Sequence, residues 1–285
     1  ATPLYMYVEC PLKFYYNKVA CLRTPMPDPE KMPSNLFGTI FHDSIQKYYE
    51  DKPDKHIERS TIEQDLADKK YTYLSACIKK AFNESNVRDN SIISGIILKY
   101  LKDVLRYDAA KAPFDIVPQY IEKFLYVPFV SKSGYMVKVG GKFDRVHIKD
   151  NIYVVVDYKT GRQPTKKINS LDEIFSSESI ENKHGDYFFQ VMLYSLIIST
   201  SNEHARNGKM VSPALFFIRH SMQDKYDPTL NIADEPIDDI RKYGDEFEEK
   251  LKHVLGEIFE PKTAFVPTEH KTRCLTCPYK AICCI

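Results

Sequence analysis

The apolar run Ile152-Tyr153-Val154-Val155-Val156 constrains the fold more than any other feature of this chain, and it ends on Asp157. A run of consecutive, mostly β-branched residues predicts a strand that is buried on both faces at the centre of a sheet. Asp150-Asn151 stands directly before the run, and these residue types favour a tight turn. We therefore predict a hairpin whose second strand covers about 152–160.

A turn centred on Asp150-Asn151 also sets the register of the hairpin. Counting outward from it places Asp144 opposite Asp157 and Lys142 opposite Lys159. Directly opposed carboxylates have Cβ atoms about 4.5 to 5.5 Å apart, where like charges repel. A hard divalent cation such as Mg²⁺ or Mn²⁺ would relieve that repulsion, and Lys159 would lie beside it because alternate residues share a strand face.

The two acids could instead form a solvated sheet edge with no cation. Against this alternative, Asp157 follows a run typical of a buried strand, and an unpaired buried carboxylate is costly. The context therefore favours a metal site.

Periodicity along the rest of the chain predicts a mixed α/β fold, with helices before the sheet and after it. The predicted helices cover about 35–50, 61–82, 91–110, 186–200 and 237–258. The predicted strands cover about 119–130, 135–149, 152–160 and 214–219, and the first three should pair as consecutive antiparallel strands. This order indicates a helical insertion before the sheet.

The bulk composition excludes few functions. Forty basic and thirty-nine acidic residues leave a net charge of +1, so a nucleic-acid partner would need a local basic patch. No apolar run reaches the roughly 18 to 20 residues of a membrane span, and no signal peptide is recognisable, so we expect a cytoplasmic protein without membrane contact. The sequence contains no G-x4-G-K-[ST] phosphate loop, so any ATP-driven motor must lie elsewhere.

Four short motifs occur in order along the chain. They are Gly38-Thr39-Ile40-Phe41-His42, Gly141-Lys142-Phe143-Asp144-Arg145, Asp157-Tyr158-Lys159-Thr160-Gly161 and Gln190-Val191-Met192-Leu193-Tyr194. Together they resemble the RecB-like branch of the PD-(D/E)XK nuclease superfamily. The chain departs from many relatives at His147, where they carry an acid, and His147 falls on the strand face opposite to Asp144.

The resemblance implies a role for each motif residue. His42, Asp144, Asp157 and the backbone carbonyl of Tyr158 would bind Mg²⁺ or Mn²⁺. Lys159 would position the attacking water, Gln190 and Tyr194 would orient Lys159 and the DNA backbone, and Glu122 would support them. Without the resemblance, His42 would be an ordinary helix histidine, and Gln190 and Tyr194 would be packing residues.

The resemblance further implies one nuclease domain over 1–285 with a restriction-endonuclease-like core. Its parts would be an N-terminal segment (1–34), a helical region with His42 (35–115), the nuclease core (116–222) and a C-terminal helix with a cysteine segment (223–285).

Seven cysteines are present, and four of them lie in the last twelve residues. Cys274, Cys277 and Cys283 have the spacing C-x2-C-x5-C, and Cys10 can complete a set of four thiolates. Such a set suits either a [4Fe-4S] cluster or a structural Zn²⁺. One cysteine before the core and three after it resemble the iron-sulfur frame of AddB-type helicase-nuclease subunits and related CRISPR-associated nucleases, which favours [4Fe-4S].

Basic residues near the catalytic strands are candidate DNA contacts. Arg162, Lys166, Lys167 and Arg219 can bind phosphates without reading bases. The stretch Lys13–Lys18 interleaves lysines with aromatic residues, which is typical of single-strand binding but more often reflects packing.

These observations predict a metal-dependent deoxyribonuclease, an exonuclease acting on single strands or duplex ends. It would be the nuclease domain of an AddB-like helicase-nuclease in DNA recombination or repair, with a helicase subunit or an upstream helicase domain as partner. The alternatives are a non-catalytic DNA-binding module of the same fold, or a protein whose cysteine-bound metal is only structural.

Overall fold

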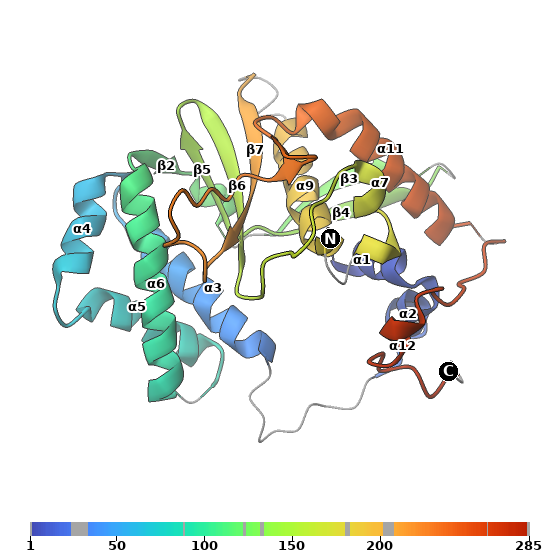
Figure 1. Ribbon diagram of the computed structural model, residues 1–285, viewed down its shortest axis with the longest axis horizontal. Coiled ribbons are helices and arrows are strands. Elements are labelled where there is room, and N and C mark those ends of the chain that lie inside the picture. The colour runs from blue at the N-terminus through green and yellow to red at the C-terminus, as the bar shows by residue number, and fades with distance from the viewer. Residues whose placement is uncertain are drawn as a thin grey trace.

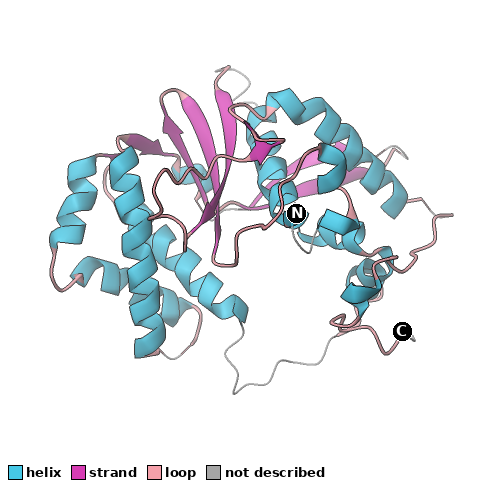
Figure 2. Ribbon diagram, viewed as in Figure 1, coloured by secondary structure: helices cyan, strands magenta, loops and turns pink. Residues whose placement is uncertain are grey.

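A five-stranded sheet in the order β1-β2-β5-β6-β7 forms the centre of the computed structural model. The strands are β1 (His56–Ile57), β2 (Phe114–Ile116), β5 (Arg145–Lys149), β6 (Ile152–Lys159) and β7 (Met210–Phe217). β6 is antiparallel to β5 and parallel to β7, and helices cover both faces (Figures 1 and 2). This arrangement confirms the predicted mixed α/β class and is consistent with a restriction-endonuclease-like core.

The structure describes residues 2–23, 34–87, 89–121, 124–131, 134–179, 183–201, 208–260 and 262–283. Glu122, for which the resemblance implies a supporting role, lies outside these ranges, and so does Cys284, the fourth of the C-terminal cysteines.

Side chains of β6 alternate between two hydrophobic cores. Tyr153 and Val155 belong to the core that includes α9 (Gly185–Thr200) and α11 (Arg241–Ile258). Val156 and Tyr158 belong to the core formed with the helices before the sheet. Asp157 and Lys159 follow the parity of Tyr153 and Val155, so both face α9. Both cores and both neighbouring strands therefore hold β6 in place.

The predicted hairpin turn and the inner part of its register are confirmed. Asp150 and Asn151 both adopt positive φ, 48° and 64°, as a two-residue hairpin turn with matching twist requires. The paired residues run from Lys149 opposite Ile152 to Arg145 opposite Val156. Strand pairing stops at Arg145, so Asp144 lies immediately before the first residue of β5.

The long strand predicted over 135–149 is wrong, because the chain bends at Phe143-Asp144. Its first part is β4 (Met136–Lys142), which pairs with β3 (Phe124–Val130) in a separate two-stranded ribbon. Lys142 therefore faces Phe124 instead of Lys159, and the three predicted strands do not form one meander. At the bend, Phe143 is fully buried and stacks on Tyr194 of α9, with ring centroids 4.5 Å apart.

The helical insertion has one more helix than predicted. It consists of α3 (Ser34–Glu50), α4 (Arg59–Ala67), α5 (Thr72–Glu84) and α6 (Ser91–Lys111). The helix expected over 61–82 is interrupted, because Asp68 accepts hydrogen bonds from the backbone N–H groups of Lys70 and Thr72. Such local capping competes with helix continuation. Asn90 caps α6 in the same way, through the N–H groups of Ile92 and Ile93.

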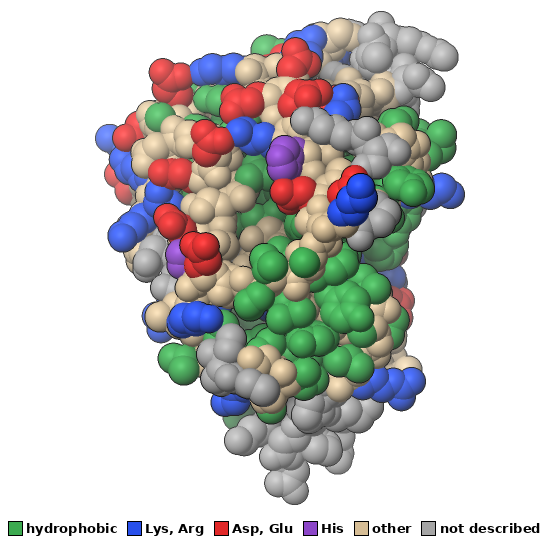
Figure 3. Space-filling view, turned by 90° about the vertical axis from the view of Figure 1, so that its right-hand side faces the viewer, with side chains coloured by type: hydrophobic (Ala, Val, Ile, Leu, Met, Phe, Trp, Pro, Cys, Tyr) green, Lys and Arg blue, Asp and Glu red, His purple; other side chains and the backbone are tan. Residues whose placement is uncertain are grey.

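The first and last described segments pack against each other beside α11 (Figure 1). They comprise α1 (Thr2–Glu9), α2 (Pro11–Phe14), a π-helical turn (Tyr15–Val19) and α12 (Lys271–Cys274). Arg273 Nη1 lies 2.9 Å from Glu9 Oε1, and Asn17 Nδ2 donates to Tyr279 Oη at 2.9 Å. Hydrophobic side chains gather on this face of the molecule (Figure 3).

Smaller elements complete the described chain. They are α7 (Leu171–Ile174), β8 (Asn231–Ile232), β9 (Glu235–Pro236) and the 3-10 turns Pro118–Tyr120 and Ser177–Ser179. Among the described helices, none combines the length and apolar character needed to cross a membrane.

Candidate active site

The acid and the lysine at the end of β6 form a buried ion pair. Lys159 Nζ lies 2.6 Å from Asp157 Oδ2, and Asp157 is only 1% exposed. Burial raises the pKa of Asp157 above its ordinary value. Burial alone would lower the pKa of Lys159, but the attraction of Asp157 raises it, so Lys159 keeps its positive charge.

Asp144 completes the group from the bend after β4. Its Oδ2 accepts a hydrogen bond from the backbone N–H of Tyr158 at 2.7 Å, and its Oδ1 lies 3.2 Å from His42 Nδ1 of α3. Burial favours the protonated acid, but His42, Lys159 and the Tyr158 N–H outweigh it and lower the pKa of Asp144. Asp144 is therefore beside Asp157 as predicted, although a side-chain hydrogen bond replaces the predicted strand pairing.

The two carboxylates suit a hard divalent cation. Mg²⁺ commonly binds to one or two carboxylates and keeps several water ligands. In the described part of the chain, no three His, Cys, Asp or Glu side chains come together as a ready metal cage. A cation at Asp144 and Asp157 would therefore take much of its coordination from water and backbone oxygen.

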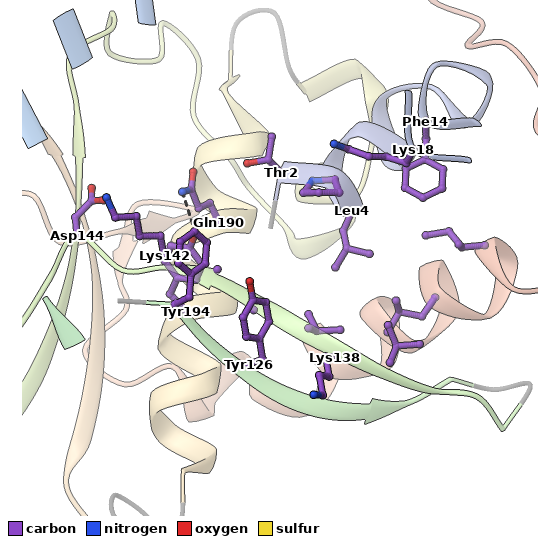
Figure 4. A pocket seen from close by; sticks show the side chains of 18 of the residues that line it. Thr2, Leu4, Phe14, Lys18, Tyr126, Lys138, Lys142, Asp144, Gln190 and Tyr194 are labelled. Atoms are coloured by element: carbon purple, nitrogen blue, oxygen red, sulfur yellow. Dashed lines mark hydrogen bonds between the residues drawn. The ribbon is translucent and has the colours of Figure 1, made fainter. Parts of the chain in front are cut away.

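Gln190 and Tyr194 lie behind the lysine, as their four-residue spacing on a helix predicts. Lys159 Nζ donates to Gln190 Oε1 at 2.9 Å. Gln190 Nε2 donates to Tyr194 Oη at 3.2 Å (Figure 4). Tyr194 packs closely on the backbone of Gly141, where an added Cβ would meet its hydroxyl at 2.4 Å. The chain of contacts from Tyr194 through Gln190 restricts where the ammonium of Lys159 can lie.

Two further features of the site were missed in the sequence analysis. The ammonium of Lys159 lies over the ring of Tyr187, 4.5 Å from its centroid, and His184 stacks on the same ring with an interplanar angle of 3°. Tyr187, Gln190 and Tyr194 stand at i, i+3 and i+7 of α9, a spacing that could have revealed Tyr187.

The other missed feature is the ion pair of Arg145 with Asp108. Two hydrogen bonds of 2.7 and 3.1 Å join their side chains, which are 4% and 2% exposed. The pair attaches α6 to β5 directly beside Asp144.

A cavity of about 960 Å³ opens beside the acids (Figure 4). His42, Asp144 and Gln190 line it at one end, and the β3–β4 ribbon lines it along one side. Leu4 of α1, Phe14 of α2 and Lys18 of the π-helical turn lie across from the ribbon. The cavity therefore leads an extended ligand to Asp144.

The predicted DNA contacts lie away from this cavity. Lys166 and Lys167 line a second cavity of about 470 Å³, and Lys167 forms an ion pair with Asp234. Arg162 and Arg219 are exposed, and neither lines the large cavity. In the stretch Lys13–Lys18, Phe14 and Tyr15 pack on Phe265, whereas Lys18 lines the large cavity.

The four cysteines of the predicted frame share one small cavity. Cys10, Cys274, Cys277 and Cys283 line a space of about 30 Å³ together with Lys13, Arg273 and Lys280. Within the described residues these thiols are not close enough together to count as a preformed metal cage. Of the remaining described cysteines, Cys21 is exposed and Cys77 is buried.

A family model for the PD-(D/E)XK nuclease superfamily matches residues 1–284. The match covers nearly the whole chain, which therefore belongs to this superfamily. Asp157-Tyr158-Lys159 fits the acid-x-lysine pattern in the family's name. Members generally hydrolyse phosphodiester bonds and usually require Mg²⁺ or Mn²⁺. No curated protein matches the chain.

Proposed function

We propose that this protein is a metal-dependent deoxyribonuclease whose catalytic residues are Asp144, Asp157, Lys159, Gln190 and Tyr194. The main support is the position of Lys159, whose ammonium lies 2.6 Å from Asp157 and 2.9 Å from Gln190 beside two buried acids. A purely structural protein has little need for three such charged groups at the end of its central strand, because burying them is costly.

In this proposal His42, Asp144, Asp157 and the Tyr158 carbonyl would hold Mg²⁺ or Mn²⁺. A bound cation lowers the pKa of a water ligand and polarises the phosphate. Lys159 orients the water and stabilises the charge that develops on the phosphate oxygens. Gln190 positions Lys159 through its Oε1, and Tyr194 positions Gln190.

Cleavage assays with the Lys159→Ala variant test the proposal. We expect the wild type to degrade linear or single-stranded DNA with Mg²⁺ or Mn²⁺, and Lys159→Ala to lose roughly 100-fold or more in rate while still binding DNA. Lys242→Ala is the matched control, since Lys242 is an exposed lysine paired with Glu235. Wild-type protein that binds DNA but never cuts it would instead support a non-catalytic binding module.

We further propose exonuclease action on single strands or duplex ends, with Arg162, Lys166, Lys167 and Arg219 as additional phosphate contacts. A helicase subunit or an upstream helicase domain would supply the strand during recombination or repair, since the sequence contains no phosphate loop. End-labelled and circular single strands separate exonuclease from endonuclease action, because only an endonuclease cuts the circle. A cytoplasmic location remains a prediction.

We propose that Cys10, Cys274, Cys277 and Cys283 bind a [4Fe-4S] cluster, with structural Zn²⁺ as the alternative. Their shared cavity supports this assignment. Anaerobic purification should give a brown protein with iron and sulfide, and Cys10→Ser should lose both. Cys21→Ser is the matched control, because Cys21 is exposed and lies outside that cavity. Zinc instead of iron in the purified protein would show that the cysteines bind structural Zn²⁺.

A further inference from the structure

Two aromatic side chains are exposed on β3 beside the candidate active site. Phe124 and Tyr126 are 63% and 55% exposed. Their rings are almost parallel, with an interplanar angle of 8° and centroids 6.2 Å apart. Large aromatic side chains lose favourable burial when they stand in water, so a parallel pair in this position points to a ligand with flat apolar faces.

The partner strand adds positive charge to the same face of the ribbon. Phe124 faces Lys142, Tyr126 faces Gly140 and Pro128 faces Lys138. The side chains that share this face are Phe124, Tyr126, Pro128 and Val130 of β3 and Met136, Lys138 and Lys142 of β4, and none of them is acidic. At Gly140, which faces Tyr126, an added Cβ would lie 1.8 Å from the Leu125 carbonyl oxygen, so the strands approach too closely there for a larger residue. Aromatic rings interleaved with lysines suit a polyanion that carries flat bases.

The large cavity connects this face with Asp144. Phe124 lines it. The lining also includes five residues labelled in Figure 4, namely Tyr126, Lys138, Lys142, Asp144 and Gln190. Lys142 also lies 4.0 Å from Asp43 of α3, which belongs to the same cavity wall. A strand that rests on the ribbon can therefore reach the catalytic end of the cavity without a break.

We propose that Phe124 and Tyr126 form a stacking platform for unpaired bases of the strand being cut, with Lys138 and Lys142 binding its phosphates. The inference rests on the proposed nuclease function and adds the residues that select single-stranded substrate. In a duplex, neighbouring base pairs already cover the base faces, so only an unpaired strand can use the platform.

Binding of a short fluorescein-labelled oligothymidylate, measured by anisotropy without divalent metal, tests the platform. An abasic oligonucleotide of equal length carries the same phosphates but nothing to stack. We expect wild type to prefer the oligothymidylate, and Phe124→Ala with Tyr126→Ala to lower that affinity by roughly 10- to 100-fold. Affinity for the abasic strand should stay within about twofold, because phosphate contacts remain.

Three further variants make the result specific. Phe124→Leu with Tyr126→Leu keeps the apolar bulk but removes the π faces, so it should lose the same preference for oligothymidylate. This variant also keeps the test valid if the alanine variant fails to fold. Tyr135→Ala changes an aromatic residue that is 52% exposed in the loop before β4 and lies outside the cavity lining, so this variant should bind like wild type. Lys138→Gln should reduce the salt dependence for both oligonucleotides by about one unit of log–log slope.

Equal wild-type affinity for the two oligonucleotides would overturn the platform, as would leucine variants that bind like wild type. Cleavage assays separate this failure from failure of the proposed function. If wild type cuts DNA while the leucine variant binds and cuts normally, only the platform is wrong. If wild type shows the base preference but never cuts, the platform stands and the nuclease proposal fails.

Discussion

At the scale of single residues, the site depends on how tightly the ammonium of Lys159 is held. Asp157, Gln190 and the ring of Tyr187 contact it from different directions. Each contact removes freedom from a side chain that would otherwise carry up to about 2 kcal/mol of rotamer entropy. An ammonium that is already oriented costs nothing further to place in the transition state.

The contact with Tyr187 gives a residue-scale prediction. Tyr187→Leu removes the π face beneath Lys159, so we expect kcat for DNA cleavage to fall by about 2- to 30-fold with little change in KM. Tyr187→Phe keeps the ring and should retain nearly full activity. Steady-state cleavage kinetics of both variants measure the difference, and an equal loss in the two would show that the hydroxyl matters and the ring does not.

At the scale of elements, the β3–β4 ribbon depends on glycine where the strands approach most closely. At Gly140 a Cβ would lie 1.8 Å from the Leu125 carbonyl oxygen, a contact that only a backbone shift could relieve. At Gly95, on the exposed side of α6, a Cβ would meet nothing within 4 Å. Replacing glycine with alanine should therefore lower the stability of the protein at Gly140 and raise it at Gly95.

Urea unfolding of two alanine variants measures this contrast. Gly140→Ala should lower the free energy of unfolding by about 2 kcal/mol, because the added methyl group forces the ribbon apart. Gly95→Ala should raise it by up to about 1 kcal/mol, because alanine favours a helix interior. A Gly140→Ala variant as stable as wild type would contradict the tight approach of β3 and β4.

At the scale of the whole molecule, the terminal segments form one wall of the large cavity. Leu4, Phe14 and Lys18 belong to that wall, and the ring of Phe265 stacks on Phe14 with centroids 6.1 Å apart. Phe265 also contacts the rings of Tyr7 and Tyr15. Residues near the end of the chain thus support the substrate cavity from outside.

Truncation of Phe265 tests that dependence. Phe265→Ala should lower the free energy of unfolding by about 2 kcal/mol, because several aromatic contacts are lost together. It should also weaken DNA binding, since the wall behind Lys18 loosens. Val266→Ala is the neighbouring control: Val266 is 55% exposed and should change stability by less than about 0.5 kcal/mol. Unfolding curves and DNA-binding anisotropy are measured for both variants. Equal stability of the two variants would contradict the role of Phe265 in supporting the cavity wall.

Local sequence by itself determined the central strand, its turn and the acid-x-lysine pattern at its end. Apolar runs, turn residues and two-residue alternation act between neighbours in the chain, so Asp157 and Lys159 could be assigned to one strand face. The four-residue spacing of Gln190 and Tyr194 placed both on one helical face for the same reason.

Only the tertiary structure decided how Asp144 is held beside Asp157 and which ring supports Lys159. The bend at Phe143 arises because α9 buries that ring against Tyr194, an interaction between segments some fifty residues apart that no local pattern encodes. Burial and long-range contacts set these positions, because their free energy appears only after the helices and sheets have packed.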